Sequence, residues 1–128
     1  MTKSPAMSTP MPGVSIHVVD VSRGVLAAGM RVALHRILND GKLDLITNGR
    51  IASNGLLEQP ELAQTFAAGG YAAVFQVGDY YRLTGVALPA VPFLDVVHFR
   101  FGIADPAQHY HLPFKCTPWG YSCFRGGA

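Results

Sequence analysis

Histidine and arginine are the side chains of this sequence best suited to move protons or to bind a developing negative charge. His17 lies within an alternating apolar–polar stretch near the N-terminus. The segment 47–50, Thr-Asn-Gly-Arg, has the composition of a turn and ends in Arg50. His109 and His111 flank a single tyrosine, so a β-strand would present both imidazoles on one face. These four residues are the first candidates for a site.

The two histidines on one face are compatible with three interpretations. They can serve as general acid and base, because a pKa of about 6.5 leaves a neutral base available at pH 7. They can hold a metal ion, but no carboxylate or cysteine lies at ligand spacing, so folding would have to bring His17 as the third ligand. They can also simply be exposed. His17 and Arg50, taken singly, are equally compatible with a structural strand histidine and a solvated arginine.

Short β-strands are the elements that must position these residues. Alternation at period two, or runs of β-branched and aromatic residues, predict strands over 14–20, 30–38, 71–77, 96–101 and 108–124, the last interrupted at Pro118. Turn signals separate them at 22–24 and 39–41. One short helix is expected over 78–85, with Asp79 as N-cap and Gly85 as C-cap, and one further turn over 59–64. The pattern predicts an all-β sandwich.

Composition narrows the classes of function. The chain has 128 residues, of which 49% are apolar and 14% charged, which suits one domain that associates with other copies. A net charge of +2 without a basic run gives no reason to expect nucleic acid. Residues 1–12 are expected to be a disordered lead-in to a domain over 13–128, with neither an export signal nor a membrane span. The two cysteines, Cys116 and Cys123, lack zinc spacing and are expected to be reduced thiols in the cytoplasm.

Five segments together resemble the 5-hydroxyisourate hydrolase branch of the transthyretin-like family. The C-terminal part is the most specific: a His-Tyr-His-x-Pro strand, then Pro-Trp-Gly-Tyr-Ser, then Arg-Gly near the end. In order along the chain, the segments are Ser15-Ile16-His17-Val18, Asn48-Gly49-Arg50, Gly78-Asp79-Tyr80-Tyr81, His109-Tyr110-His111-Leu112-Pro113 and Pro118-Trp119-Gly120-Tyr121-Ser122. The resemblance extends over nearly the whole chain from Gly13.

The resemblance implies a fold, an assembly and a reaction. The fold would be an eight-stranded transthyretin-like β-sandwich with one short helix. Four copies would form a dimer of dimers around a central channel, with the sites at the dimer–dimer interface. The reaction would be the hydrolysis of 5-hydroxyisourate in urate catabolism, the ring opening of a cyclic amide by water that histidine activates, without a cofactor or a metal. Carried over residue by residue, the resemblance makes His17, Arg50 and His111 catalytic, with the base left open between the two histidines. It places His109, Phe124, Arg125, Gly126 and Gly127 at the substrate.

The tail departs from the family's pattern, and two alternatives therefore remain beside the hydrolase. Phe124 stands where the hydrolases have tyrosine, Gly127 stands where they have serine, and Ala128 is additional. Cys116 and Cys123 stand where the family has an aliphatic residue and a threonine. One alternative is a related enzyme acting on another cyclic amide or imine. The other is a carrier of small molecules that, like transthyretin, catalyses nothing.

Overall fold

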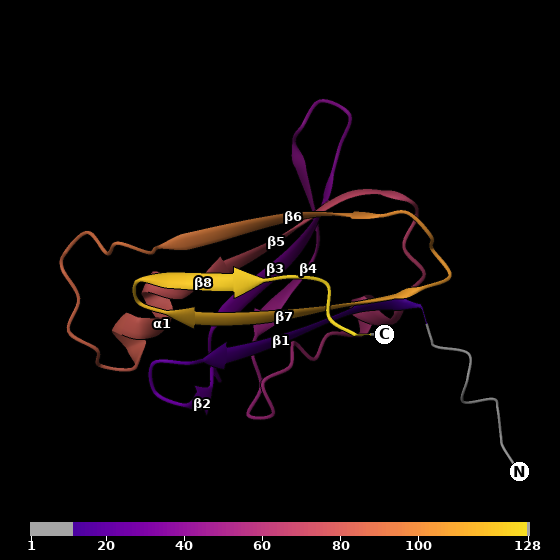
Figure 1. Ribbon diagram of the computed structural model, residues 1–128. Helices are drawn as coiled ribbons and strands as arrows, with labels where there is room; N and C mark the ends of the chain where they lie inside the picture. Colours follow the sequence, from indigo (N-terminus) through magenta and orange to yellow (C-terminus); the bar gives the residue numbers. More distant parts are fainter. Residues whose placement is uncertain (1–11, 128) are drawn as a thin grey trace, which may run out of the picture.

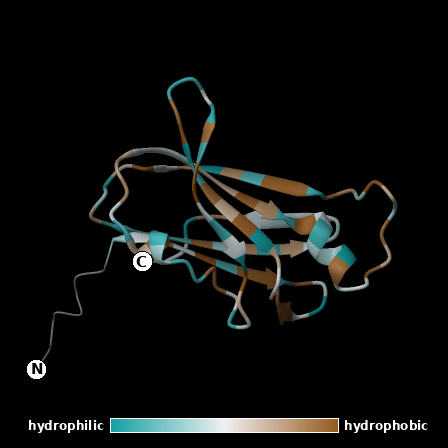
Figure 2. Cartoon of the chain, turned by 180° about the vertical axis from the view of Figure 1, so that it is seen from behind, coloured by the Kyte–Doolittle hydropathy of each residue, from teal (hydrophilic) through white to brown (hydrophobic). Residues whose placement is uncertain are grey.

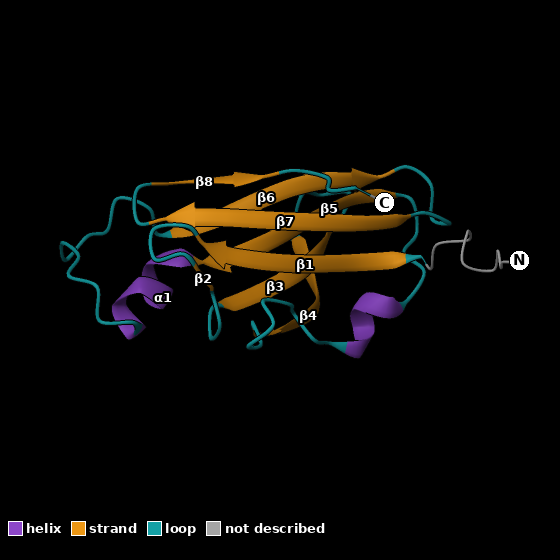
Figure 3. Cartoon of the chain, turned by 60° about the horizontal axis from the view of Figure 1, so that its bottom comes forward, coloured by secondary structure: helices purple, strands orange, loops and turns teal. Residues whose placement is uncertain are grey.

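A computed structural model describes residues 12–127 of the chain as two four-stranded sheets packed face to face (Figures 1 and 3). One sheet has the order β2 (Val25–Leu26), β1 (Gly13–Asp20), β7 (His109–Thr117) and β8 (Gly120–Cys123). The other has the order β4 (Leu43–Arg50), β3 (Arg31–Ile37), β5 (Gly69–Gln76) and β6 (Val96–Ile103). The prediction of an eight-stranded all-β sandwich is confirmed. The predicted lead-in, except for Pro12, lies outside the described residues.

The core lies between the two sheets and follows from the alternation in the strands. Along β1, Val14, Ile16 and Val18 are buried, whereas the residues between them are only half-buried. The rings of Phe75 and Phe114 stack across the sandwich with centroids 3.9 Å apart. Burial of one face of each sheet leaves the two other faces pointing away from the core in opposite directions.

Within residues 12–127 the one α-helix, α1 (Val77–Leu83), follows β5 as predicted, but its start differs from the expectation. Gln76 occupies the N-cap position, and Asp79 lies in the first turn, where it forms an ion pair with Arg82 at 2.8 Å. Gly85 adopts a φ of +82° just beyond the helix, which suits glycine as the residue that ends it. The expected extra turn is also present, as a 3₁₀ helix over Pro60–Ala63.

A buried carboxylate ties α1 to the end of β1. Asp20 is fully buried and accepts hydrogen bonds from Tyr81 Oη at 2.7 Å, Tyr80 Oη at 3.0 Å and Ser22 Oγ at 2.6 Å. Burial alone would raise the pKa of Asp20, but these hydrogen bonds together hold it below its ordinary value of 3.8. The carboxylate is therefore charged at neutral pH and fixes the helix against the sandwich.

Two sequence expectations are corrected by the strands. The segment 47–50 is not a turn: it is the second half of β4, paired with β3 so that Gly49 lies opposite Val32. The turn comes later, at 52–55, where the Gly55 amide donates to the Ala52 carbonyl. The predicted last strand is two strands, β7 and β8, because the chain reverses between Thr117 and Gly120.

The β3–β4 hairpin projects from the sandwich and is largely hydrophilic at its tip (Figure 2). Within residues 12–127 no helix is long and apolar enough to cross a membrane.

Candidate active site

The outer face of the sheet β2-β1-β7-β8 gathers three of the five histidines. β1 and β7 run parallel, with Ser15 opposite His111 and Gly13 opposite His109. Because the alternate residues of both strands are buried in the core, Ser15, His17, His109 and His111 point outward together. We call these four residues the histidine face. The predicted proximity of His17 to the other two histidines is thus a property of the strand register.

Ser15 lies between two of the imidazoles. Its Oγ is 2.8 Å from Nε2 of His109 and 2.6 Å from Nδ1 of His111. A hydroxyl has one proton, so it can donate to only one of these nitrogens and must accept from the other. The hydrogen bonds use Nδ1 of His111 and leave its Nε2 as the ring nitrogen available to a substrate.

The environment keeps His111 neutral. Burial first, and then the positive charge that His17 and His109 can carry, hold the pKa of His111 below its ordinary value of 6.5. At pH 7 the imidazole is therefore mostly unprotonated. A neutral imidazole with a free nitrogen is the form needed to accept a proton from water.

Two glycines allow close packing against the site histidines. Gly55, at a φ of +85°, lies so near His17 that a Cβ there would be 2.6 Å from the ring Nε2. The amide of Gly126 donates to the carbonyl of His111 at 2.7 Å, and a Cβ on Gly126 would lie 2.7 Å from His111 Cδ2. A side chain at either position would therefore displace an imidazole of the site. The C-terminal segment lies directly against one of the two imidazoles predicted to be catalytic.

The remaining tail residues differ in what they contact. Arg125 stacks its guanidinium 4.0 Å from the centre of the Tyr110 ring and donates to Gln108 Oε1 and the His109 carbonyl. It therefore anchors the tail to β7. Phe124 is half exposed, with the Lys115 ammonium 5.9 Å from its ring centre. Gly127 is exposed, and a Cβ there would have no neighbour within 4 Å.

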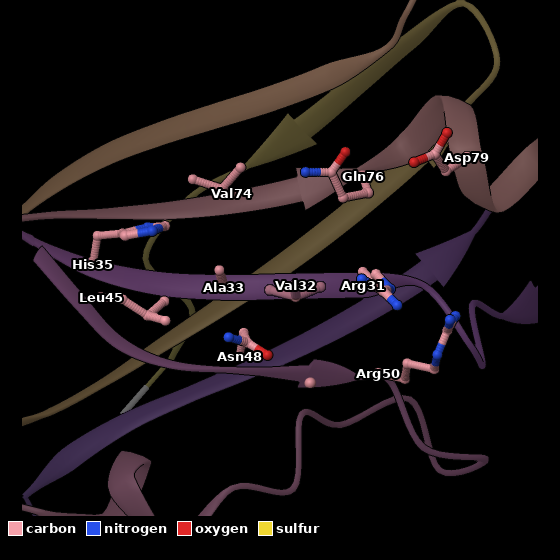
Figure 4. A pocket seen from close by; sticks show the side chains of 11 residues that line it. Arg31, Val32, Ala33, His35, Leu45, Asn48, Arg50, Val74, Gln76 and Asp79 are labelled. Carbon is pink, nitrogen blue, oxygen red and sulfur yellow. The ribbon is translucent and has the colours of Figure 1, made fainter. Parts of the chain in front are cut away.

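Arg50 is the one predicted catalytic residue that the fold does not bring to the histidines. It is at the end of β4, opposite Arg31, and points from the outer face of the other sheet. Its Nη1 donates to the carbonyl of Gly29 at 3.0 Å. With Arg31 it lines a cavity of about 730 Å³ on that face (Figure 4). The predicted grouping of Arg50 with His17 and His111 is thus not formed within one chain.

The local chain path explains why. The edge of β1 beside His17 is occupied by the segment that follows the 52–55 turn, and the residue that bridges to His17 is Leu56. The backbone there is joined by hydrogen bonds from Val18 N to Gly55 O at 2.9 Å and from Leu57 N to Ile16 O at 3.1 Å. The residue that follows the observed turn, beside His17, is thus Leu56, whereas Arg50 ends β4.

Three site residues were not assigned a role from the sequence. Ser15 was visible as the residue that shares a strand face with His17, but nothing in the sequence showed that it lies between two imidazoles of another strand. Nothing in the sequence around Gly55 or Lys115 indicates that either residue belongs to a site. Lys115 points outward from β7 on the same side as His111 because the two are four residues apart on one strand. Among residues 12–127 no three His, Cys, Asp or Glu side chains form a group that could hold a metal ion.

Comparison with known proteins identifies similar chains. The model of the HIUase/Transthyretin family matches residues 14–126. The 5-hydroxyisourate hydrolase of Halalkalibacterium halodurans is 43% identical over 88% of this chain and 96% of its own. The 5-hydroxyisourate hydrolase 2 of Rhizobium meliloti is 40% identical over 98% of this chain and 99% of its own.

Two solved structures are also similar. The 5-hydroxyisourate hydrolase of Klebsiella pneumoniae has a TM-score of 0.75 and 27% identity, covering 91% of this chain and all of that one. An (S)-allantoin synthase has a TM-score of 0.82 and 35% identity, covering 90% of this chain but 43% of the other. The match to this second protein is therefore to one part of a longer chain.

Proposed function

The chain belongs to the HIUase/Transthyretin family, and from this premise we propose that it hydrolyses 5-hydroxyisourate, opening a cyclic amide with water as a step of urate catabolism. Relatives about 40% identical over nearly the full length of both chains carry the name of that hydrolase. The observation that carries the proposal is the histidine face: His17 and His111 lie together on an outward-facing sheet surface, and His111 is held neutral.

The chemistry requires a base, a donor for the developing oxyanion and a proton for the leaving nitrogen. Nε2 of His111 accepts a proton from water as the oxygen adds to the ring carbonyl carbon. The tetrahedral adduct then collapses, the carbon–nitrogen bond of the ring breaks, and the nitrogen takes up a proton. His17 lies on the same face and orients the water or the substrate. General acid–base catalysis of this kind contributes about 100- to 10,000-fold. No metal or cofactor enters the proposal.

Lys115 is the cation that we assign to the oxyanion in place of Arg50. It is exposed on β7 on the side of the histidines, whereas Arg125 is engaged by the Tyr110 ring and two hydrogen-bond acceptors. A flexible ammonium can reach along the strand toward a substrate bound over His111. Replacement of Lys115 by methionine should lower kcat by about 10- to 100-fold, less than the loss of a fully preorganised donor.

We further propose that four copies assemble as a dimer of dimers, with histidine faces opposed. β6 and β8 are each one of the two edge strands of their sheet, and such edges pair readily with another copy. Large hydrophobic side chains are exposed beside them: Trp119 is 61% exposed and Tyr121 is 49% exposed. Light scattering on the purified protein tests the assembly, and a monomer at micromolar concentration would contradict it.

The two cysteines support a place in the cytoplasm. Cys116 and Cys123 are free thiols, and burial raises the pKa of Cys116 to about 11 and that of Cys123 to about 12. Such thiols stay protonated and unreactive in a reducing compartment. Cell fractionation with an antibody to the chain tests this assignment.

The direct test of the function follows freshly generated 5-hydroxyisourate by ultraviolet absorbance with and without the protein. Acceleration by the wild-type chain, abolished in the His17→Asn/His111→Asn double variant, supports the proposal. Binding of the compound without acceleration would favour a carrier. Absence of both, with activity on another cyclic amide, would favour the related enzyme. Prior treatment with EDTA should leave the rate unchanged.

A further inference from the structure

We propose that the hydroxyl of Ser15 relays a proton between His111 and His109 during the hydrolysis. This inference rests on the proposed function, because the relay serves the base of that reaction. Its basis is the position of one hydroxyl between two imidazoles, 2.6 Å from His111 Nδ1 and 2.8 Å from His109 Nε2. Ser15 contacts no reacting atom and acts through His111, so it is a positioning residue.

The single proton of the hydroxyl couples the tautomers of the two histidines. In one arrangement His111 donates from Nδ1 to Ser15 Oγ, and the hydroxyl donates to Nε2 of His109. In the other, His109 donates to the hydroxyl, which donates to His111 and leaves the proton of that ring on Nε2. Only the first arrangement leaves the lone pair on His111 Nε2 that a base requires. We therefore assign the first arrangement to the free protein.

Proton movement along this path balances. When His111 Nε2 takes a proton from water, the Nδ1 proton can pass to Ser15 Oγ while the hydroxyl proton passes to His109 Nε2. His111 is then neutral with its proton on Nε2, and His109 is the imidazolium. When the leaving ring nitrogen takes the Nε2 proton, the extra proton on His109 returns through Ser15 to His111 Nδ1. The cycle ends in the starting state, and the serine oxygen forms no covalent bond to the substrate.

The surroundings favour transfer of the charge away from His111. The lowered pKa of His111 means that its imidazolium is disfavoured where it lies. The titratable groups that lower the pKa of His111 besides burial are His17 from β1 and His109 from β7. The carboxylate of Glu58, on the segment that bridges to His17, accepts a hydrogen bond from Asn54. Moving the proton from His111 to His109 takes the charge farther from Lys115 and toward Arg125, which donates to the His109 carbonyl at 3.2 Å.

Kinetics provide the first arm of the test. Ser15→Ala should lower kcat on 5-hydroxyisourate by about 10- to 100-fold, the range found when a hydrogen-bonded partner that orients a functional histidine is lost. Ser15→Thr keeps the hydroxyl and should restore kcat to within about threefold of wild type. His109→Asn should lower kcat to a similar extent, and Ser15→Ala/His109→Asn should be no worse than the worse single variant, because both act on one path. Ser53→Ala, at an exposed serine, is the matched control and should retain wild-type kcat.

Nuclear magnetic resonance provides an arm independent of activity. The ¹⁵N shifts of His111 at pH 7.5 should show Nδ1 protonated and Nε2 unprotonated in the wild type, and a mixture of tautomers in Ser15→Ala. A wild-type His111 protonated on Nε2 would overturn the relay. So would wild-type kcat in Ser15→Ala or in His109→Asn. An inactive wild type with the expected shifts would refute the proposed function and leave the hydrogen-bonded arrangement standing.

Discussion

Replacing Gly126 by alanine tests whether the tail controls the position of His111. In the structure a Cβ at this residue would lie 2.7 Å from Cδ2 of His111 and 3.2 Å from Cδ of Pro113. Ordinary carbon–carbon contacts are about 3.5–4.0 Å, so the overlap with the imidazole is about 1 Å. The proline ring cannot move aside easily, and the tail is tied to His111 by the hydrogen bond from Gly126 N. The imidazole should therefore rotate away from Ser15.

A displacement of that size is large for a catalytic base. A misplacement of about 1 Å costs about 100-fold in rate, so Gly126→Ala should lower kcat on 5-hydroxyisourate by about 100-fold. The free energy of unfolding should fall by about 1 kcal/mol, the low end of the usual cost of overpacking, because Gly126 is only half-buried. The assay is the decay of 5-hydroxyisourate, with the ¹⁵N shifts of His111 measured on the same sample and thermal unfolding as the check on folding.

Gly120→Ala is the matched control. A Cβ at Gly120 would meet nothing within 4 Å, so this variant carries the same added methyl without the overlap and should retain wild-type kcat. Wild-type kcat in Gly126→Ala would refute the reasoning. In that case the tail itself has moved, and the Gly126 amide should have lost its protection from hydrogen exchange.

Three further predictions follow from the described contacts. His17→Asn and His111→Asn should each lower kcat by about 100- to 1,000-fold. The kcat of Arg50→Gln should stay within about twofold of wild type, because Arg50 lies on the opposite sheet. A loss of kcat in Arg50→Gln equal to that of the histidine variants would show that a second copy brings Arg50 to the site. The rate should fall on the acidic side with a midpoint below pH 6.5, because protonation removes the base and the pKa of His111 is lowered; a midpoint above pH 6.5 in the pH–rate profile would contradict this. Asp20→Asn should reduce the free energy of unfolding at pH 7 by about 3 kcal/mol, since Tyr81 loses a charged acceptor. Because the pKa of Asp20 is lowered on folding, the wild type should lose this advantage below about pH 4, and urea unfolding at pH 7 and pH 3 measures it.

The sandwich could be predicted from the sequence because alternation is a local property of each strand. Residues 14–20 alternate in hydropathy, and β1 is buried on the side that the pattern indicates. The same period-two rule placed His109 and His111 on one face. What the rule cannot supply is which strands become neighbours, since pairing depends on contacts between residues far apart in the chain. The relation of Ser15 to His111, 96 residues away, is of this kind.

The turn predicted at 47–50 lies instead at 52–55, and the reason is local. The sequence contains Asn-Gly twice, at 48–49 and at 54–55, and both are compatible with a turn. The first is held in β4 by its pairing with β3, and only the second adopts the positive φ of a turn glycine, at Gly55. The residue that follows this second pair, and that bridges to His17, is Leu56.

An arginine that follows the first Asn-Gly is therefore directed to the opposite side of the sandwich, and an apolar side chain occupies the position beside His17. In the proposed mechanism, an oxyanion at the histidine face takes its cation from another strand of the same chain. Lys115 on β7 is exposed on the correct side, and Arg125 is held by Tyr110 and by its hydrogen bonds. The proposed site therefore combines His17 and His111 with a positive charge from β7, and the length of the Lys115 side chain allows its ammonium to extend toward the substrate.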